Sequence, residues 1–280
     1  MNKTLVVIVV AVLVLGGIAW YVYESRPQPA AEPAAVAELA PEPVAPAAPE
    51  PMPEAAQPPV QPSVETPPPE TVEPALPPLA ESDAYAGETL SGLVGEAAVL
   101  RYFTAENVVA KAVATVDALS GRQVPKPILA LQGPGDDYPA LEISDPETVI
   151  RDENGDPIPQ FVPAPAAYAR YTPYVEMLEA VPPAEFVAQL RSNESLFDEA
   201  WRQLGYADSR FEDRLARVID ELLATPEATD PPRLIRPEAY YLFADDRLEA
   251  LGAGQKLLLR MGTDNAARVK SWLSEVRQAL

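Results

Sequence analysis

The sequence predicts a mainly α-helical protein: a single-pass transmembrane helix, a disordered proline-rich linker, and a helical domain with a small β-hairpin or irregular insertion. Three observations predict this fold class. A long uncharged apolar run lies near the N-terminus, a segment dense in proline follows it, and later segments repeat apolar residues at helical spacing. The predicted boundaries are 1–26 for the anchor, 27–78 for the linker and 79–280 for the domain.

The anchor is predicted by the uncharged run Leu5–Tyr23. A helix of this length spans roughly 28 Å, close to the hydrocarbon thickness of about 30 Å. Lys3 precedes the run and no Lys or Arg occurs in 27–78, so the positive-inside rule predicts a bacterial inner-membrane protein with a cytoplasmic N-terminus and a periplasmic domain. A cleaved signal peptide is the alternative, but the apolar core is long and no A-x-A pattern directly follows it.

The linker contains eighteen prolines and eight glutamates without one basic residue. Proline favours the polyproline II conformation, and at about 3.1 Å per residue the segment could extend on the order of 160 Å. We therefore expect a semi-rigid spacer. A docking string for proline-binding modules is the alternative, because Pro43, Pro46 and Pro49 have Pro-x-x-Pro spacing.

Composition excludes several classes of function. The 280 residues contain no Cys and no His, which excludes disulfides, Ser-His-Asp or Cys-His catalysis, and metal sites built on thiolate or imidazole. The net charge of −21 argues against binding to nucleic acid. We therefore expect no cofactor, no metal site and no catalytic residue.

Several segments of the domain have a helical apolar stripe. The clearest follows Ser209 and Glu212, which have the spacing of a capping box, and ends before Thr225-Pro226. Ser82, Thr104, Thr172 and Thr263 are further predicted N-caps. The predicted helices cover 82–93, 105–119, 172–180, 183–204, 209–224, 245–251, 254–261 and 263–280.

The region 124–171 is predicted to be the insertion, because prolines divide it. We expect a hairpin that pairs 147–151 with 157–162 around Asn154-Gly155. Asp152, Asn154 and Asp156 have the spacing of the first calcium ligands of an EF-hand. Proline occupies the sixth and twelfth positions of that loop, at 157 and 163, so solvated turn acids are the favoured interpretation.

Five stretches resemble a bacterial envelope family known as domain of unknown function 3014: LPPLAESDAYAGETLSGLVGEAAVLRYF, ARYTPYVEMLEAV, LFDEAWRQLGY, FEDRLARVIDELLATPE and YLFADDRLEALGAGQKLLLRMGTDNAARVKSWL. The resemblance covers roughly Leu79 to Leu280. It implies an N-terminal membrane helix and a proline-rich stretch ahead of this domain, and it implies no catalytic residue.

The candidate partner site is predicted from the difference in net charge between the domain and its C-terminal segment. The domain has 33 acidic and 19 basic residues, whereas 254–280 has a net charge of +3. A basic surface there would bind an acidic envelope protein, an anionic glycan or the glutamate-rich linker. Ordinary solvated helix faces are the alternative interpretation. The candidate residues are Lys256, Arg260, Arg268, Lys270 and Arg277.

Other polar and aromatic sets have simpler interpretations. Asp245 and Asp246 are adjacent at a predicted helix start, which indicates capping rather than a catalytic pair, and Asp136-Asp137 is interpreted as a solvated loop. Six aromatic residues with Arg170 could line a peptide or sugar groove, but core packing is favoured. They are Tyr168, Tyr171, Tyr174, Tyr240, Tyr241 and Phe243.

These observations favour a non-enzymatic role. We expect a membrane-anchored periplasmic module that mediates interaction or scaffolding in the cell envelope. The alternative is an envelope glycan hydrolase that uses two carboxylates about 5 to 10 Å apart.

Overall fold

The computed structural model describes residues 76–280 except 130, 135–136, 145–148, 228–230 and 238–240. The predicted anchor Leu5–Tyr23 and nearly all of the predicted linker 27–78 lie outside the described residues. Among the described residues, no helix combines the length and apolar character needed to cross a membrane.

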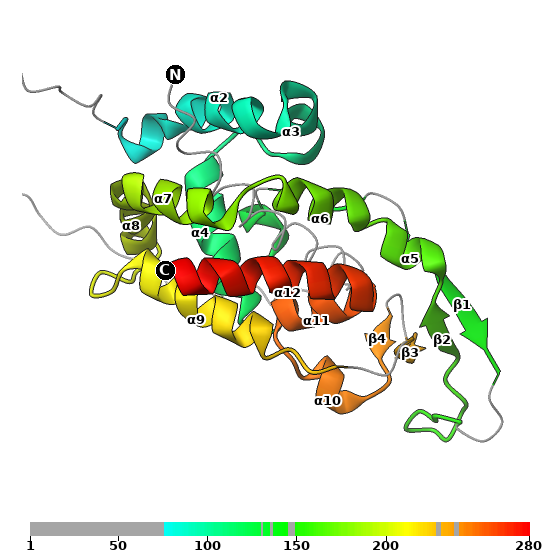
Figure 1. The fold of residues 1–280 in the computed structure, drawn as a ribbon. Helices are drawn as coiled ribbons and strands as arrows, with labels where there is room; N and C mark the ends of the chain where they lie inside the picture. The colour runs from blue at the N-terminus through cyan, green and yellow to red at the C-terminus, as the bar shows by residue number, and fades with distance from the viewer. Residues whose placement is uncertain (1–75, 130, 135–136, 145–148, 228–230, 238–240) are drawn as a thin grey trace, which may run out of the picture. The chain divides into compact units, whose positions relative to one another are not determined.

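The described chain is mainly helical, as predicted (Figure 1). Short 3-10 turns cover Leu79–Glu81 and Lys126–Ile128. The helices are α2 (Ser82–Val94), α3 (Glu96–Tyr102), α4 (Val108–Leu119), α5 (Pro165–Ala169), α6 (Thr172–Glu179), α7 (Pro183–Ser192), α8 (Glu194–Gln203), α9 (Phe211–Leu223), α10 (Asp246–Glu249), α11 (Ala253–Arg260) and α12 (Gly262–Ala279). The strands are β1 (Ala140–Ile143), β2 (Gln160–Pro163), β3 (Leu234–Ile235) and β4 (Leu242–Phe243).

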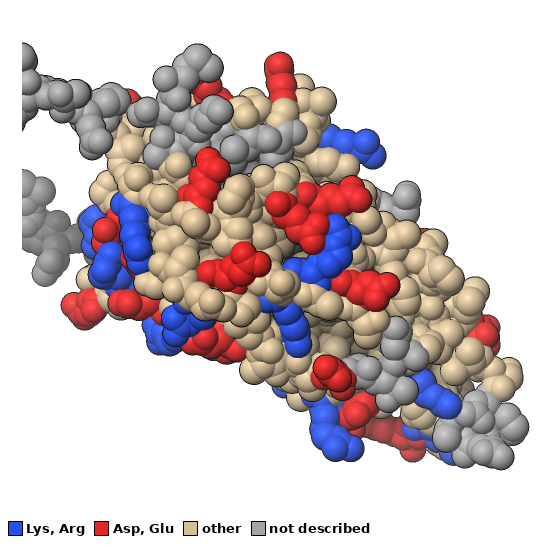
Figure 2. Space-filling model, in the orientation of Figure 1, with Lys and Arg blue, Asp and Glu red and all other residues tan. Residues whose placement is uncertain are grey.

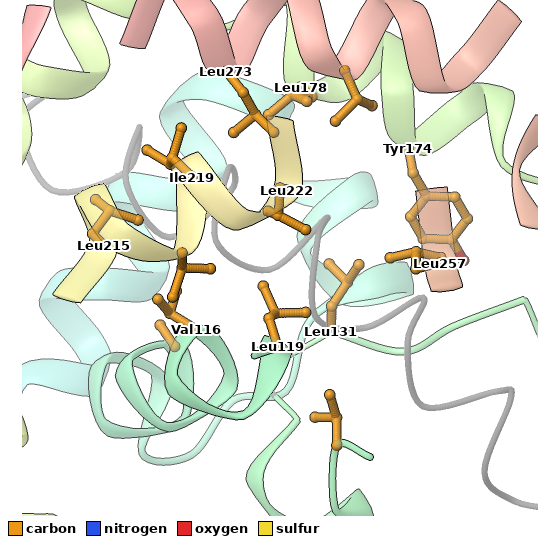
Figure 3. Packing of buried hydrophobic residues seen from close by; sticks show 14 of the residues in the cluster. Val116, Leu119, Leu131, Tyr174, Leu178, Leu215, Ile219, Leu222, Leu257 and Leu273 are labelled. Atoms are coloured by element: carbon orange, nitrogen blue, oxygen red, sulfur yellow. The ribbon is translucent and has the colours of Figure 1, made fainter. Parts of the chain in front are cut away.

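The core lies where α12 packs against α6, α7, α9 and α11, and where α4 packs against α8 and α9 (Figures 1 and 3). The apolar stripe predicted for 209–224 supplies the buried face of α9. Figure 3 shows Leu215, Ile219 and Leu222 between Val116 of α4 and Leu273 of α12. This stripe therefore joins two layers of helices.

The sheet partly confirms the predicted hairpin. Gly155 has a positive φ at its tip, and Arg151 forms a bridge with Pro157. The longer partner of β2 is β1, however, with Leu141 opposite Val162. The pairing predicted between 147–151 and 157–162 is limited to 150–151 and 157–158, where Ile158 donates its N–H to the carbonyl of Ile150 at 2.8 Å, because prolines 157 and 159 cannot donate to a longer ladder. Residues 147–148 lie outside the described residues. The antiparallel order is β1-β2-β3-β4.

The first backbone N–H groups of α4 and α9 are capped by side chains of other helices, and not by the local residues that the sequence predicts. The predicted caps Thr104 and Ser209 do not act as N-caps. Asp83 of α2 accepts the backbone N–H groups of Asn107 and Val108 at 2.7 and 2.9 Å, at the start of α4. Asp198 of α8 likewise accepts the N–H of Phe211 at 2.9 Å, at the start of α9. These carboxylates supply acceptors that a local side chain would otherwise provide.

Three other predicted N-caps are also wrong, because Ser82, Thr172 and Thr263 lie within the helices that they precede in the prediction. The predicted single helix over 183–204 is broken at Asn193, where φ −115° and ψ 16° leave the helical range. The prediction for Asp245 is confirmed: its carboxylate accepts the N–H of Arg247 at 2.9 Å and caps α10.

Candidate functional site

The structure does not bring the five predicted cations together on one basic surface. Lys256 and Arg260, on α11, are only 4% and 2% exposed. They therefore offer no surface for an acidic partner, and both are used in internal contacts. The remaining three are on α12, where Arg277 and Lys270 reach α9 and the segment just after it, and Arg268 reaches α6.

Lys256 forms a buried ion pair with Glu249. Its Nζ lies 2.9 Å from one carboxylate oxygen, and the other oxygen accepts the N–H of Phe243 at 3.0 Å. The pair thus ties α11 to α10 and to β4. Such a pair offsets the desolvation cost of each charge, so removal of one partner leaves a costly buried ion.

Arg260 is held by aromatic rings and a backbone carbonyl. Its guanidinium carbon lies 4.8 Å from the ring centre of Phe243 and 5.5 Å from that of Tyr138, and its Nη2 donates to the carbonyl of Tyr241. Among the described contacts its Nε has no hydrogen-bond partner. Burial raises the pKa of Tyr138 to about 12, and the Arg260 charge opposes that shift, so this tyrosine stays neutral.

The α12 arginines reach acidic residues of neighbouring helices. Arg268 pairs with Glu179 of α6, and Arg277 donates to both oxygens of Asp220 of α9 at 2.7 and 3.1 Å. These hydrogen bonds lower the pKa of both carboxyls. On the face in Figure 2, basic side chains lie among acidic ones rather than in a continuous basic patch.

Lys270 differs from Lys256, Arg268 and Arg277, which pair with carboxylates, because its ammonium donates to a backbone carbonyl. Its Nζ donates to the backbone carbonyl of Thr225 at 2.7 Å, just beyond the C-terminus of α9. A cation at this end is favourable for the helix dipole. This contact places Lys270 in the wall of a solvent-facing depression.

We call this depression the apolar hollow. It has a volume of about 340 Å³ and lies between the segment after α9 and the elbow of α11 and α12. Most of its lining is apolar, with Glu227, Lys270 and two threonines as the polar exceptions. Its lining residues are Thr225, Pro226, Glu227, Pro232, Leu258, Leu259, Gly262, Thr263, Ala266, Ala267 and Lys270.

Local sequence explains why the apolar hollow exists. Pro226 follows the end of α9, and the hydroxyl of Thr225 donates to the carbonyl of Leu222 at 2.6 Å, which fixes the turn of the chain. Gly262 has φ +80°, and a Cβ there would lie 2.8 Å from Cδ1 of Tyr168, so glycine is needed at this elbow. Ala266 and Ala267 are short, so the space beside them stays open.

A second depression, which we call the polar hollow, has a volume of about 630 Å³. Arg233 on its wall donates to the side-chain oxygen of Gln160 at 3.2 Å, and Glu227 and Asp245 are its two carboxylates. Both hollows include Glu227 and Pro232. The remaining lining residues are Val149, Ile150, Pro231, Ala244 and Leu248.

The predicted aromatic set belongs mainly to the core, as favoured. Tyr171, Tyr174 and Phe243 are buried, and burial raises the pKa of Tyr174 to about 12. Tyr241 packs against Phe161 with ring centres 5.1 Å apart. Tyr240 lies outside the described residues. Arg170 donates to the carbonyls of Pro134 and Asp137, so it serves a loop rather than a groove.

Hydrogen bonds within the loop 152–156 fix the conformation of the segment that has calcium-ligand spacing. One oxygen of Asp152 accepts the N–H groups of Asn154 and Asp156 at 2.9 and 2.8 Å, which is the geometry of an Asx turn. Within the described part of the chain, no three acidic residues are grouped so that they could hold a metal ion. Asp136, of the other acidic pair, lies outside that part.

Sequence reasoning named Lys270 as a candidate but missed the apolar hollow that this residue lines. The available signal was Gly262 and Ala266, small residues one helical turn apart, near prolines 226 and 232 that are close to them only in space.

The family model described as "Protein of unknown function (DUF3014)" matches residues 108–277. This match covers α4 to α12 and therefore both hollows. No curated protein and no solved structure matches the chain significantly.

Proposed function

The chain belongs to the DUF3014 family of proteins of unknown function, and on that premise we propose that it is an interaction or scaffolding module of the bacterial cell envelope. In this proposal Leu5–Tyr23 anchors it in the inner membrane and the 79–280 domain works in the periplasm. The observation that carries the proposal is the apolar hollow, which opens to solvent beside charged residues.

An apolar depression with a few polar groups at its edge is typical of a site that receives a side chain of a partner. The hollow can bury one aliphatic or aromatic side chain, and central apolar contacts of this kind dominate the energy of many interfaces. Two ion pairs join α12 to α6 and α9, and they hold in place the helix that forms one wall of the apolar hollow.

The test is crosslinking in cells followed by capture through the C-terminus of the full chain. The native chain is compared with Ala267→Leu, which fills the apolar hollow, and with Ala188→Leu on the exposed face of α7 as a matched control. We expect a reproducible envelope partner with the native chain and the control, and its loss with Ala267→Leu. A partner retained by Ala267→Leu would contradict docking at the hollow.

The proposed location has an independent test. Because the chain has no cysteine, Ser271→Cys introduces a single thiol at an exposed position of α12. We expect a membrane-impermeant maleimide to label it in cells whose outer membrane has been made permeable. Labelling only after the inner membrane is broken would contradict a periplasmic domain.

A carboxylate-dependent glycan hydrolase is the second candidate, because Glu227 and Asp245 both line the polar hollow. Asp245 already caps α10, which favours a structural role for it. Incubation of the purified full chain with envelope glycan fragments tests this candidate. Turnover that Glu227→Gln abolishes would establish it and replace the interaction proposal.

A further inference from the structure

Building on the proposed interaction function, we propose that the partner at the apolar hollow is a basic polypeptide segment. One apolar side chain of the segment enters the hollow, and a flanking Lys or Arg of the segment pairs with Glu227. The inference reverses the charge expected from the sequence, where the five cations indicated an acidic partner.

The apolar half of the interaction follows from the lining. Leu258 and Leu259 of α11, Pro226, and Ala266 of α12 contribute carbon surface to one depression. Its volume of about 340 Å³ is enough for a leucine or phenylalanine side chain. Burial of such a side chain is favourable without any charged contact.

Glu227 supplies the charged half. It is exposed and lines both hollows, so a chain that runs from one to the other passes beside it. Within the described chain, no hydrogen bond or ion pair involves the carboxylate of Glu227. A carboxylate at the rim of an apolar depression is complementary to an ammonium or guanidinium that flanks an apolar anchor.

The cations cannot easily serve an acidic partner, because the fold already uses them. Lys256 pairs with Glu249, Arg268 with Glu179 and Arg277 with Asp220. Arg260 is buried, and the charge of Lys270 faces the carbonyl of Thr225 at the end of α9. Of the two charged residues that line the apolar hollow, Lys270 is therefore held by a hydrogen bond, and the carboxylate of Glu227 is the one that no hydrogen bond or ion pair within the described chain holds.

The charge of the whole domain supports the same choice of partner. Residues 79–280 carry 33 acidic and 19 basic side chains, so the domain attracts a basic segment before contact. The segment 27–78 has eight glutamates and no basic residue, and a second copy of the domain has the same negative charge. Both are repelled at long range, although salt screens the effect.

The experiment uses the purified full chain in detergent and three short labelled peptides. The first has one leucine flanked by lysines in a glycine-serine background, the second replaces lysine with glutamate, and the third replaces leucine with serine. Affinity is measured by fluorescence anisotropy at low and physiological salt. We expect the first peptide to bind, the third to bind about tenfold more weakly, and the second to give no saturable binding.

Variants assign the binding to the site. We expect Glu227→Gln to weaken the lysine peptide at least about threefold, and Ala267→Leu to weaken it about tenfold. Glu275→Gln removes the same charge from an exposed position of α12 that does not line either hollow, and it should leave the affinity unchanged. Equal losses in Glu227→Gln and Glu275→Gln would overturn the inference, because attraction would then be non-specific.

The inference can fail while the proposed function stands. If crosslinking finds an envelope partner that Ala267→Leu loses, but the glutamate peptide binds as well as or better than the lysine peptide, the hollow is a docking site for another chemistry. If neither the in-cell partner nor any peptide depends on the hollow, both proposals fall.

Discussion

The two adjacent helices α11 and α12 use their basic residues in opposite ways. On α11, Lys256 and Arg260 are nearly fully buried and hold the helix to β4 and to neighbouring rings. On α12, Arg268 and Arg277 extend over the surface to acids on α6 and α9. The difference arises because α11 is enclosed by other elements, whereas α12 keeps one face in water.

A basic residue contributes a different amount to the stability of the domain depending on how deeply it is buried. A buried charge must keep its partner, since water cannot replace it. When an exposed ion pair is broken, water hydrates both charges, so the loss of stability is small. We therefore expect changes on α11 to affect the stability of the domain far more than changes on α12. Trp201 and Trp272 are buried and report unfolding by fluorescence.

The largest expected effect is that of Glu249→Ala. The substitution leaves the ammonium of Lys256 buried without its carboxylate, so the free energy of unfolding should fall by about 3 kcal/mol in urea titrations. The double change Glu249→Leu with Lys256→Met should cost less than the single change, because it removes both charges. A loss below about 0.5 kcal/mol in Glu249→Ala, typical of an exposed pair, would remove the distinction between the helices.

A smaller effect is expected from Gly254→Ala in α11. The added Cβ would lie 2.6 Å from Cδ2 of Leu222 and 3.3 Å from Cβ of Leu119, so the Leu222 side chain must leave its position and Leu119 must give way. We expect a loss of about 1 to 2 kcal/mol in the same urea titration. Gly87→Ala is the control: its Cβ would meet nothing within 4 Å, and it should stabilise α2 by about 0.5 to 1 kcal/mol.

Arg260→Lys is expected to cost about 1 to 2 kcal/mol by urea denaturation. Lysine keeps the charge but loses the planar group that lies over Phe243 and Tyr138 and donates to the Tyr241 carbonyl. The corresponding change Arg268→Lys on α12 should cost less than about 0.5 kcal/mol. Equal losses in the two variants would mean that burial of Arg260 does not set its contribution.

The smallest effect is expected for the Arg268–Glu179 pair. A double-mutant cycle with Glu179→Gln and Arg268→Gln should give a coupling of about 0.5 kcal/mol, reduced by salt. The hydrogen bond from Arg268 lowers the pKa of Glu179, so its contribution is present above the ordinary pKa and disappears as pH falls through the lowered value. Unfolding midpoints measured from pH 7 downward check this. A coupling that grows in acid would contradict the assignment.

The sequence by itself determined most of the helical segments and several of their ends, although no helix was predicted at α3 or α5. Apolar spacing along 209–224, the proline after Thr225 and the acids at 245–246 depend on interactions within a few residues of the chain, and the structure agrees with them. Membership of the DUF3014 family was likewise evident from local stretches of sequence. Interactions between residues that are close in the chain can be predicted directly from the sequence.

Only the tertiary structure decided the placement of charge. Lys256 and Arg260 have the spacing of an exposed basic face, yet neighbouring elements cover them. Asp83 and Asp198 cap helices that follow in the chain, and the hollow brings Pro232 beside Ala266. These outcomes depend on which elements become neighbours in space, and burial by a distant segment decides whether a charge faces solvent or an internal partner.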